Sequence, residues 1–181
     1  MLAIYEAAFP ASERRTAADL AAMLARPDYR MVVMEEAGAV TGFASVQALD
    51  EPAIAQLDYI ATAPGLRNGG RGAALFAAAA ELARGRPLLV EVDSDREDCA
   101  DRALRARRKG FYARLGCRTI EGLDSRLGLD AAGPQPLMDL MVLGPLPGSA
   151  DELRAWLVAV FVEVYGQAAD DPRIDEMMAT D

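Results

Sequence analysis

Histidine is absent from all 181 residues of this chain. Without imidazole, the chain cannot perform Ser-His-Asp or Cys-His catalysis, and it cannot bind a metal through histidine. Any proton transfer must therefore use carboxylates, tyrosine, lysine, cysteine or water.

Cysteine and long apolar runs are also scarce. Cys99 and Cys117 are the only cysteines; their spacing matches no metal or redox motif, so we expect reduced thiols. The longest apolar runs, 73–80 and 156–162, fall far short of the roughly 20 residues that a membrane span needs. No basic segment precedes an apolar stretch at the start, so we expect no secretory signal and a cytoplasmic protein.

A large basic surface is missing as well. The net charge of −9 divides into −5 for residues 1–60, +2 for 61–148 and −6 for 149–181. Nucleic acids need basic side chains to neutralise their phosphates, so this distribution predicts no nucleic-acid partner. Acidic flanks would suit a cationic amine as substrate.

The most informative stretch runs from Leu57 to Phe76 and has the pattern of a strand, a tight loop and a helix. Gly69, Gly70 and Gly72 let the backbone N–H groups of the loop converge at the start of the helix. Free N–H groups and the positive end of a helix dipole form an anion site. Because Arg67 and Arg71 add positive charge there, we interpret the loop as a cradle for a diphosphate.

Two alternatives exist for this loop. Three glycines can simply turn the chain. A dinucleotide fold would place an acidic residue about 20 positions further on, where Glu91 and Asp93 stand. However, Leu75 replaces the third glycine of that fingerprint, and repeated strand–helix–strand units are missing.

The spacing Arg67-x-x-Gly70-x-Gly72, after a strand that ends in Ala61-Thr62-Ala63-Pro64, resembles the acyl-CoA signature of the GNAT superfamily of N-acyltransferases. The resemblance covers about residues 4–144 and implies acetyl-CoA as co-substrate. It also implies a mixed, mostly antiparallel central sheet with one parallel strand–helix–strand crossover. The residues expected to hold the coenzyme are Ile60, Ala61, Thr62, Arg67, Asn68, Gly69, Gly70, Arg71, Gly72 and Ala73.

A second signature lies in the basic helical segment 102–118. Phe111-Tyr112-x-x-x-Gly116-Cys117 is similar to the family's Phe-Tyr-x-x-x-Gly-Phe, with Cys117 in place of the last Phe. By this resemblance Tyr112 protonates the departing coenzyme A thiolate, and a phenol with a pKa near ~10 can donate at neutral pH. The alternative is a tyrosine of the core. The asparagine often found one or two turns earlier is absent, and Arg105 and Arg108 occupy that region.

No activated nucleophile is visible, so direct attack by an amine is expected, without an acyl-enzyme. Backbone N–H groups of the strand 57–62 would polarise the thioester carbonyl. Asp58 on this strand is the first candidate for the base that deprotonates the amine, and Glu91 is the second, each directly or through water. Gln56 stands where some relatives place a glutamate.

Acidic residues are dense from Glu91 to Asp98. A polar loop after a strand is the simpler interpretation, with Glu91 as its inward-facing residue. A calcium loop would need glycine at its sixth position, where Asp98 stands. We expect no metal site.

The flanks of the predicted fold are partly typical of the family. Helical spacing over residues 4–9 and a capping box at Thr16-x-x-Asp19 predict two helices that would form a wall of the acceptor site. Phe9-Pro10-x-x-Glu13-Arg14 resembles an uncharacterised branch of the superfamily. The family's usual strand before the first helix is missing, so the acceptor side is expected to be trimmed. Segments 118–121 and 136–143 predict a closing antiparallel pair, and 122–135 a long loop near the acceptor.

The C-terminal part predicts a helix beyond the family's core. Apolar residues recur at helical spacing on Leu153, Trp156, Leu157, Val160, Phe161 and Val164. We therefore expect an N-acyltransferase domain over 1–148 and a helical extension over 149–181. The helix packs on its own domain or forms a homodimer contact, and the acidic tail from Gln167 is expected to fray.

The sequence thus predicts an N-acetyltransferase that moves an acetyl group from acetyl-CoA to a primary amine of a small molecule or peptide. The alternative is a non-catalytic module that binds acyl-CoA.

Overall fold

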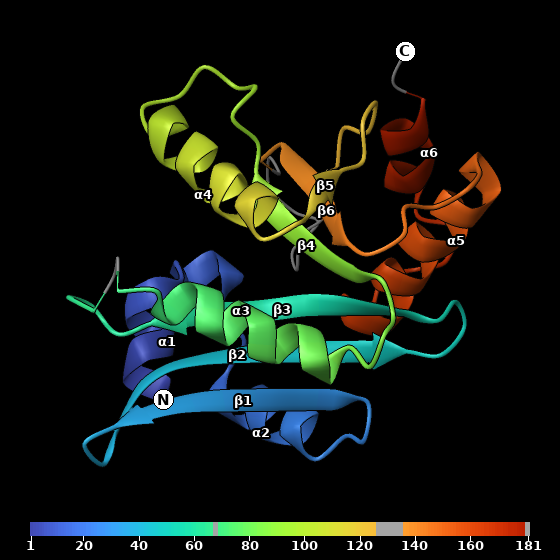
Figure 1. The fold of residues 1–181 in the computed structure, drawn as a ribbon. Helices are drawn as coiled ribbons and strands as arrows, with labels where there is room; N and C mark the ends of the chain where they lie inside the picture. The colour runs from blue at the N-terminus through green and yellow to red at the C-terminus, as the bar shows by residue number, and fades with distance from the viewer. Residues whose placement is uncertain (67–68, 126–135, 180–181) are drawn as a thin grey trace. The chain divides into compact units, whose positions relative to one another are not determined.

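The computed structural model describes residues 1–66, 69–125 and 136–179 (Figure 1). The chain forms two compact units. The first contains residues 1–48 and 55–86, and the second contains 49–54 and 87–181. No helix in the described ranges is long and apolar enough to cross a membrane.

The first unit is built on three neighbouring strands, β1 (Tyr29–Glu36), β2 (Ala39–Leu49) and β3 (Ile54–Thr62). β1 and β2 are antiparallel, with Tyr29 opposite Gln47 and Glu36 opposite Ala39. The turn between them has φ of 51° at Ala37 and 77° at Gly38. Two consecutive positive φ angles match the right-handed twist of a hairpin.

Helices cover both faces of these strands. α1 (Leu2–Ala8), the short helix η1 (Ala11–Glu13) and α2 (Ala17–Leu24) lie on one side, where α1 and α2 form a core with Phe43 and Tyr59. The predicted capping box begins α2, with Asp19 N donating to Thr16 Oγ1 at 3.1 Å. α3 (Arg71–Leu82) packs on the other side, where a Cβ built on Gly42 would meet Leu75 at 2.7 Å. Glycine at position 42 therefore permits the close approach of α3.

In the second unit, β6 (Met138–Leu143) pairs antiparallel with β4 (Leu88–Asp93) on one side and with β5 (Arg118–Thr119) on the other. This pairing confirms the predicted closing strands. α4 (Arg102–Arg114) precedes β5, and Gly116 after it has φ of 94°. The helix ends before Gly116, because glycine adopts this left-handed conformation without strain.

The C-terminal segment consists of α5 (Ala150–Ala159), a π-helical turn η2 (Val160–Val164) and α6 (Pro172–Met178). The expectation that the tail frays from Gln167 is wrong. Asp171 caps α6 and Pro172 occupies its first turn, while Ile174 and Met177 are each only 1% exposed. Asp-Pro is a start signal for a helix, and the two buried side chains anchor that helix to the core. The core shared by these helices with β4 and β6 includes Leu89, Leu140, Val142, Trp156, Leu157, Phe161, Val164, Ile174 and Met177.

Candidate functional site

The start of α3 has the features of an anion site. Gly70 is the N-cap residue with φ of 78°, and no side chain caps the helix. Side-chain oxygens of Thr16, Ser149 and Asp171 cap α2, α5 and α6, whereas α1 and α4, like α3, have no side-chain cap. The first N–H groups of an α-helix have no partner within the helix. In α3 these groups belong to Arg71, Gly72 and Ala73, and no side chain caps them.

Arg71 has a partner that the sequence did not reveal. Its guanidinium forms a bidentate ion pair with Glu36 at the end of β1, with Nε–Oε1 at 2.7 Å and Nη2–Oε2 at 2.8 Å. The pairing raises the pKa of Arg71 and lowers that of Glu36. Arg71 would have to exchange this carboxylate in order to contact a phosphate. The predicted ligands Arg67 and Asn68 lie outside the described residues.

Asp58 on β3 is a partly buried carboxylate within the first unit. Its Oδ2 accepts a hydrogen bond from the hydroxyl of Tyr29 at 2.6 Å. Burial raises the pKa of Asp58, while the bond from Tyr29 and the charge of Arg15 oppose part of that rise. A carboxyl group with a raised pKa is better suited to accept a proton near neutral pH than an ordinary one. Gln56, two positions earlier on β3, is 2% exposed.

Three predicted coenzyme residues end the same strand. Ile60, Ala61 and Thr62 are the last residues of β3, and Ala63 N then donates to Thr41 O of β2 at 2.8 Å. The chain then passes through Pro64 and Gly65 toward the start of α3. The end of β3 and the first turn of α3 therefore belong to one unit.

Tyr112 lies in the last turn of α4 in the second unit and is 9% exposed. Its ring packs against Phe111 at 5.1 Å between centroids. Burial raises the pKa of Tyr112, as does the nearby thiol of Cys117, whose own pKa burial raises to about 11. The phenol therefore remains protonated throughout the physiological range, as a proton donor must.

Acidic residues after β4 hold α4 in place. Arg105 pairs with Glu97 at 3.0 Å, and Arg108 pairs with Asp93 at 2.8 Å. Lys109, one turn before Tyr112, contacts the buried carboxylate of Asp139 on β6 at 2.7 Å. These pairs give Asp93 and Glu97 of the acidic run a structural role as counter-ions of the basic helix. Within the described ranges no group of His, Cys, Asp or Glu residues could hold a metal ion.

Glu91 on β4 contacts the C-terminal segment of its own unit. The hydroxyl of Tyr165 lies 2.7 Å from Oε1 and 2.8 Å from Oε2 of Glu91. A phenol has a single proton, which both carboxylate oxygens share here. Tyr165 thus bonds both oxygens of Glu91, whereas Tyr29 bonds a single oxygen of Asp58.

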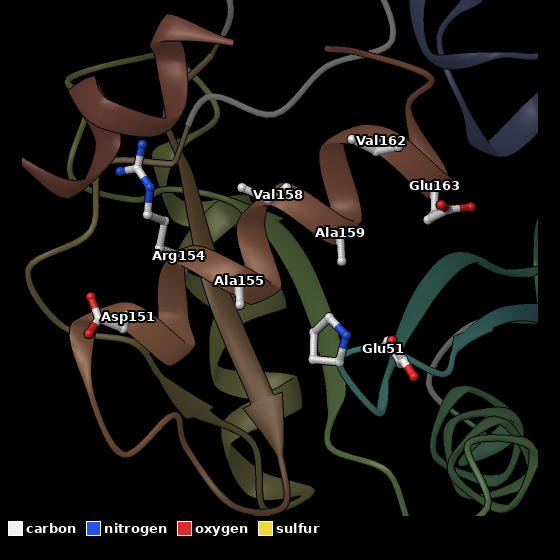
Figure 2. A pocket seen from close by; sticks show the side chains of 9 residues that line it. Glu51, Asp151, Arg154, Ala155, Val158, Ala159, Val162 and Glu163 are labelled. Carbon is white, nitrogen blue, oxygen red and sulfur yellow. The ribbon is translucent and has the colours of Figure 1, made fainter. Parts of the chain in front are cut away.

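A hollow of about 500 Å³ opens on α5 in the second unit (Figure 2). Its lining combines an apolar stripe of the helix with charged residues and the turn between β2 and β3. No predicted site residue lines it, so it does not support the predicted coenzyme site. The lining residues are Glu51, Pro52, Asp151, Arg154, Ala155, Val158, Ala159, Val162 and Glu163.

The sequence did not indicate the partners of three predicted residues: Tyr29 for Asp58, Glu36 for Arg71 and Tyr165 for Glu91. Tyr29 is the first residue of β1, and no motif marks it. Only the pattern of alternating strand residues could have suggested that it faces the core. The predicted acceptor loop 122–135 lies outside the described residues from 126 onward.

The sequence model of the Acetyltransferase (GNAT) family matches residues 1–116 of the chain. No curated protein sequence matches. Among solved structures, a GNAT-family protein from Bacteroides thetaiotaomicron shares 26% identity and a TM-score of 0.76, over 93% of this chain and 91% of that one. This likeness confirms the predicted fold class, a mixed, mostly antiparallel α/β fold with a parallel crossover.

Two further solved structures are similar over a smaller part of the chain. Nourseothricin acetyltransferase shares 29% identity and a TM-score of 0.51, over 67% of each chain. A GNAT acetyltransferase from Elizabethkingia anophelis, solved with acetyl-CoA bound, shares 13% identity and a TM-score of 0.54, over 72% of this chain and 84% of that one. At this identity the second likeness concerns the fold alone.

Proposed function

Because the chain belongs to the GNAT family of acetyltransferases, we propose that it transfers an acetyl group from acetyl-CoA to the primary amine of an acceptor. The observation that carries this proposal is the start of α3, where glycine precedes a helix without a side-chain cap. Uncapped N–H groups at such a start suit the diphosphate of coenzyme A. Acetyl-CoA bound to the Elizabethkingia protein of similar fold supports the choice of coenzyme.

Direct attack is the proposed mechanism. The amine nitrogen bonds to the thioester carbonyl carbon, the carbon–sulfur bond breaks, and coenzyme A leaves as a thiolate. Asp58 accepts the proton that the amine loses, because burial raises its affinity for protons. Tyr112 supplies the proton that the thiolate gains, because its phenol is protonated at every pH at which the protein would work.

The acceptor is proposed to be a cationic amine. The chain carries a net charge of −9, and acidic surfaces attract cations and raise their association rates. Nourseothricin acetyltransferase, a solved structure with 29% identity, adds nourseothricin to the small-molecule amines worth testing. A peptide amine remains the other class of acceptor, and a cytoplasmic location and the absence of a nucleic-acid partner remain predictions from the sequence.

The test is release of free coenzyme A thiol from acetyl-CoA in the presence of an amine panel. The panel contains nourseothricin, a polyamine and a short peptide with a free N-terminus. We expect amine-dependent release with at least one class, and mass spectrometry should find the acetyl group on the amine. Acetyl-CoA binding without release for any amine would support the non-catalytic module instead.

We also propose the boundary between an N-acyltransferase domain over 1–148 and a C-terminal extension over 149–181, and a homodimer that forms through this extension. The outer face of α5 supports the pairing. In an antiparallel pair of helices centred between Val158 and Ala159, Ala155 of one copy meets Val162 of the other. Arg154 of one copy then meets Glu163 of the other, so charges of opposite sign face each other in both halves.

A further inference from the structure

Asp58 is held from one side by a hydrogen-bonded chain of three side chains in the first unit. The hydroxyl of Tyr29 lies 2.6 Å from Asp58 Oδ2 and 2.8 Å from Ser45 Oγ. Tyr29 is 3% exposed and Ser45 is not exposed at all. Ser45 lies on β2 directly opposite Met31, two residues after Tyr29 on β1. Three neighbouring strands therefore supply one member each.

The chemistry of the three groups sets the direction of the two hydrogen bonds between them. A carboxylate can only accept, and the phenol has a single proton, so Tyr29 donates to Asp58. The hydroxyl of Ser45 then donates to the oxygen of Tyr29. A short bond to an ionised acceptor is of the strong, charge-assisted type. Oδ2 is thereby occupied by Tyr29.

Three elements present titratable or charged groups to Asp58. Tyr29 comes from β1, Tyr59 from β3 itself, and Arg15 from the segment between η1 and α2. That segment is fixed, because Arg15 N donates to Tyr5 Oη at 2.7 Å and the hydroxyl of Tyr59 donates to Glu13 O at 3.1 Å. Tyr29 is the residue among these that bonds the carboxylate directly. The hydroxyl of Tyr59 is directed to a backbone carbonyl instead.

We infer that Tyr29 is the positioning residue of the reaction, holding Asp58 through Oδ2 so that Oδ1 faces the acceptor amine. The inference rests on the proposed function, in which Asp58 is the base. Orientation of the carboxylate matters because a base must lie within hydrogen-bond reach of the proton that it removes. Ser45 has a role as well, because its fully buried hydroxyl keeps the phenol of Tyr29 directed toward β3.

The test compares Tyr29→Phe with Tyr59→Phe in the full chain. Both variants remove one hydroxyl from a buried tyrosine of the first unit and keep the ring, but of the two only Tyr29 bonds Asp58. The first measurement is the titration of Asp58 by NMR with ¹³C-labelled aspartate, in which its signal is the one missing from Asp58→Asn. In Tyr29→Phe the midpoint should rise by about one pH unit, because a bond that stabilises the charged form is lost. In Tyr59→Phe it should move much less.

The second measurement is kcat/KM against pH with an acceptor found in the amine panel. The acidic limb should move to higher pH in Tyr29→Phe, and kcat should fall about 10-fold with little change in the affinity for acetyl-CoA. The pKa of the amine is the same in experiments with all variants. A shift of the acidic limb between two variants therefore comes from a group of the protein. In an Asp58→Asn background, Tyr29→Phe should have no further effect on kcat.

The two proposals fail in different ways. Full activity of Asp58→Asn would show that Asp58 is not the base in the proposed reaction. A large loss in Asp58→Asn, together with an unmoved midpoint and an unmoved acidic limb in Tyr29→Phe, would overturn the positioning role of Tyr29 alone. The titration needs no acceptor, so it decides the contact even where no amine of the panel reacts.

Discussion

Tyr112 combines a buried ring with a phenol whose pKa is raised, so the phenol keeps its proton at neutral pH. Tyr112→Phe keeps the ring and the helix and removes only the hydroxyl. We expect unchanged affinity for acetyl-CoA and a fall in kcat of about 10²–10⁴-fold, the usual effect of a positioned general acid. Calorimetric titration and steady-state kinetics measure the two quantities separately.

The pH profile gives an independent check on Tyr112. Because burial raises its pKa, ionisation of the phenol should not limit turnover below pH 10 in the wild-type protein. Loss of activity confined to KM would mean that Tyr112 only binds the substrate. Undiminished turnover in Tyr112→Phe would show that water or another group protonates the thiolate.

We expect the ionised carboxylate of Asp58 to lower the free energy of unfolding at neutral pH. Its pKa is raised by burial, so the folded protein binds this proton more tightly than the unfolded chain does. Stability attributable to Asp58 therefore falls as pH rises from the unfolded pKa of about 3.9 through the folded value. At pH 7, Asp58→Asn should raise the melting temperature while it lowers activity, and the gain should shrink in acid.

Asp28 is the matched control, because its pKa is lowered by hydrogen bonding to Arg26. That shift contributes stability above the unfolded pKa, so Asp28→Asn should lower the melting temperature at pH 7. Thermal unfolding at several pH values measures both variants. A lower melting temperature in Asp58→Asn would indicate a structural carboxylate and not a site kept for function.

At the scale of the element, the first turn of α3 is the part of the protein that we expect to hold the coenzyme. Gly70→Asp places a negative charge where a phosphate would lie and should abolish binding of acetyl-CoA. Gly65→Asp is the matched control. Gly65 has φ of 83° and Gly70 of 78°, and a Cβ at either meets nothing within 4 Å. The backbone strain is therefore similar, and only Gly70 begins the helix.

Calorimetry with both folded variants decides the question. The expected result is loss of binding in Gly70→Asp and measurable binding in Gly65→Asp. Equal affinities for acetyl-CoA in the two variants would show that the diphosphate does not bind at the start of α3.

The C-terminal helices form part of the core of the second unit and are not an appendage. Removal of residues 149–181 would expose Leu89, Leu140 and Val142 on the strands that α5 and α6 cover. We expect the shortened chain to lose its cooperative thermal transition and to aggregate, because large apolar patches associate. A chain that lacks only residues 179–181 keeps Met177 and should melt like the full chain. Identical melting of the chain cut at 148 would contradict this prediction.

At the scale of the whole molecule, we expect two copies of the chain to pair through α5. Val158 lies in the hollow of Figure 2, and Val33 on β1 of the other unit is 45% exposed. Sedimentation should give twice 19.3 kDa for the wild-type chain. Val158→Glu should give a single copy, because it buries a charge in the pairing, while Val33→Glu should remain paired. A wild-type chain that sediments as one copy would exclude the homodimer.

Features encoded by neighbouring residues could be predicted from the sequence alone. The hairpin at Ala37-Gly38, the capping box at Thr16 and the end of α4 at Gly116 each depend on backbone preferences within a few positions. The glycine loop before α3 belongs to the same class. Its family resemblance was sufficient to predict the fold and the acetyltransferase family, and the family match and the similar solved structures confirm both. The start of α6 is equally local, because Asp171-Pro172 is a start signal for a helix.

The partners of the site residues were decided by the tertiary structure. Tyr29 bonds Asp58 across 29 positions, Arg71 bonds Glu36 across 35, and Tyr165 bonds Glu91 across 74. Strand register and helix packing bring these side chains together, and no local pattern records which pairs will meet. The consequences are chemical, because burial and hydrogen bonding set whether a carboxylate is available as a base. From the sequence, Asp58 and Glu91 were both carboxylates on predicted strands. Only the packing of the folded chain brings Tyr29 to Asp58 and Tyr165 to Glu91.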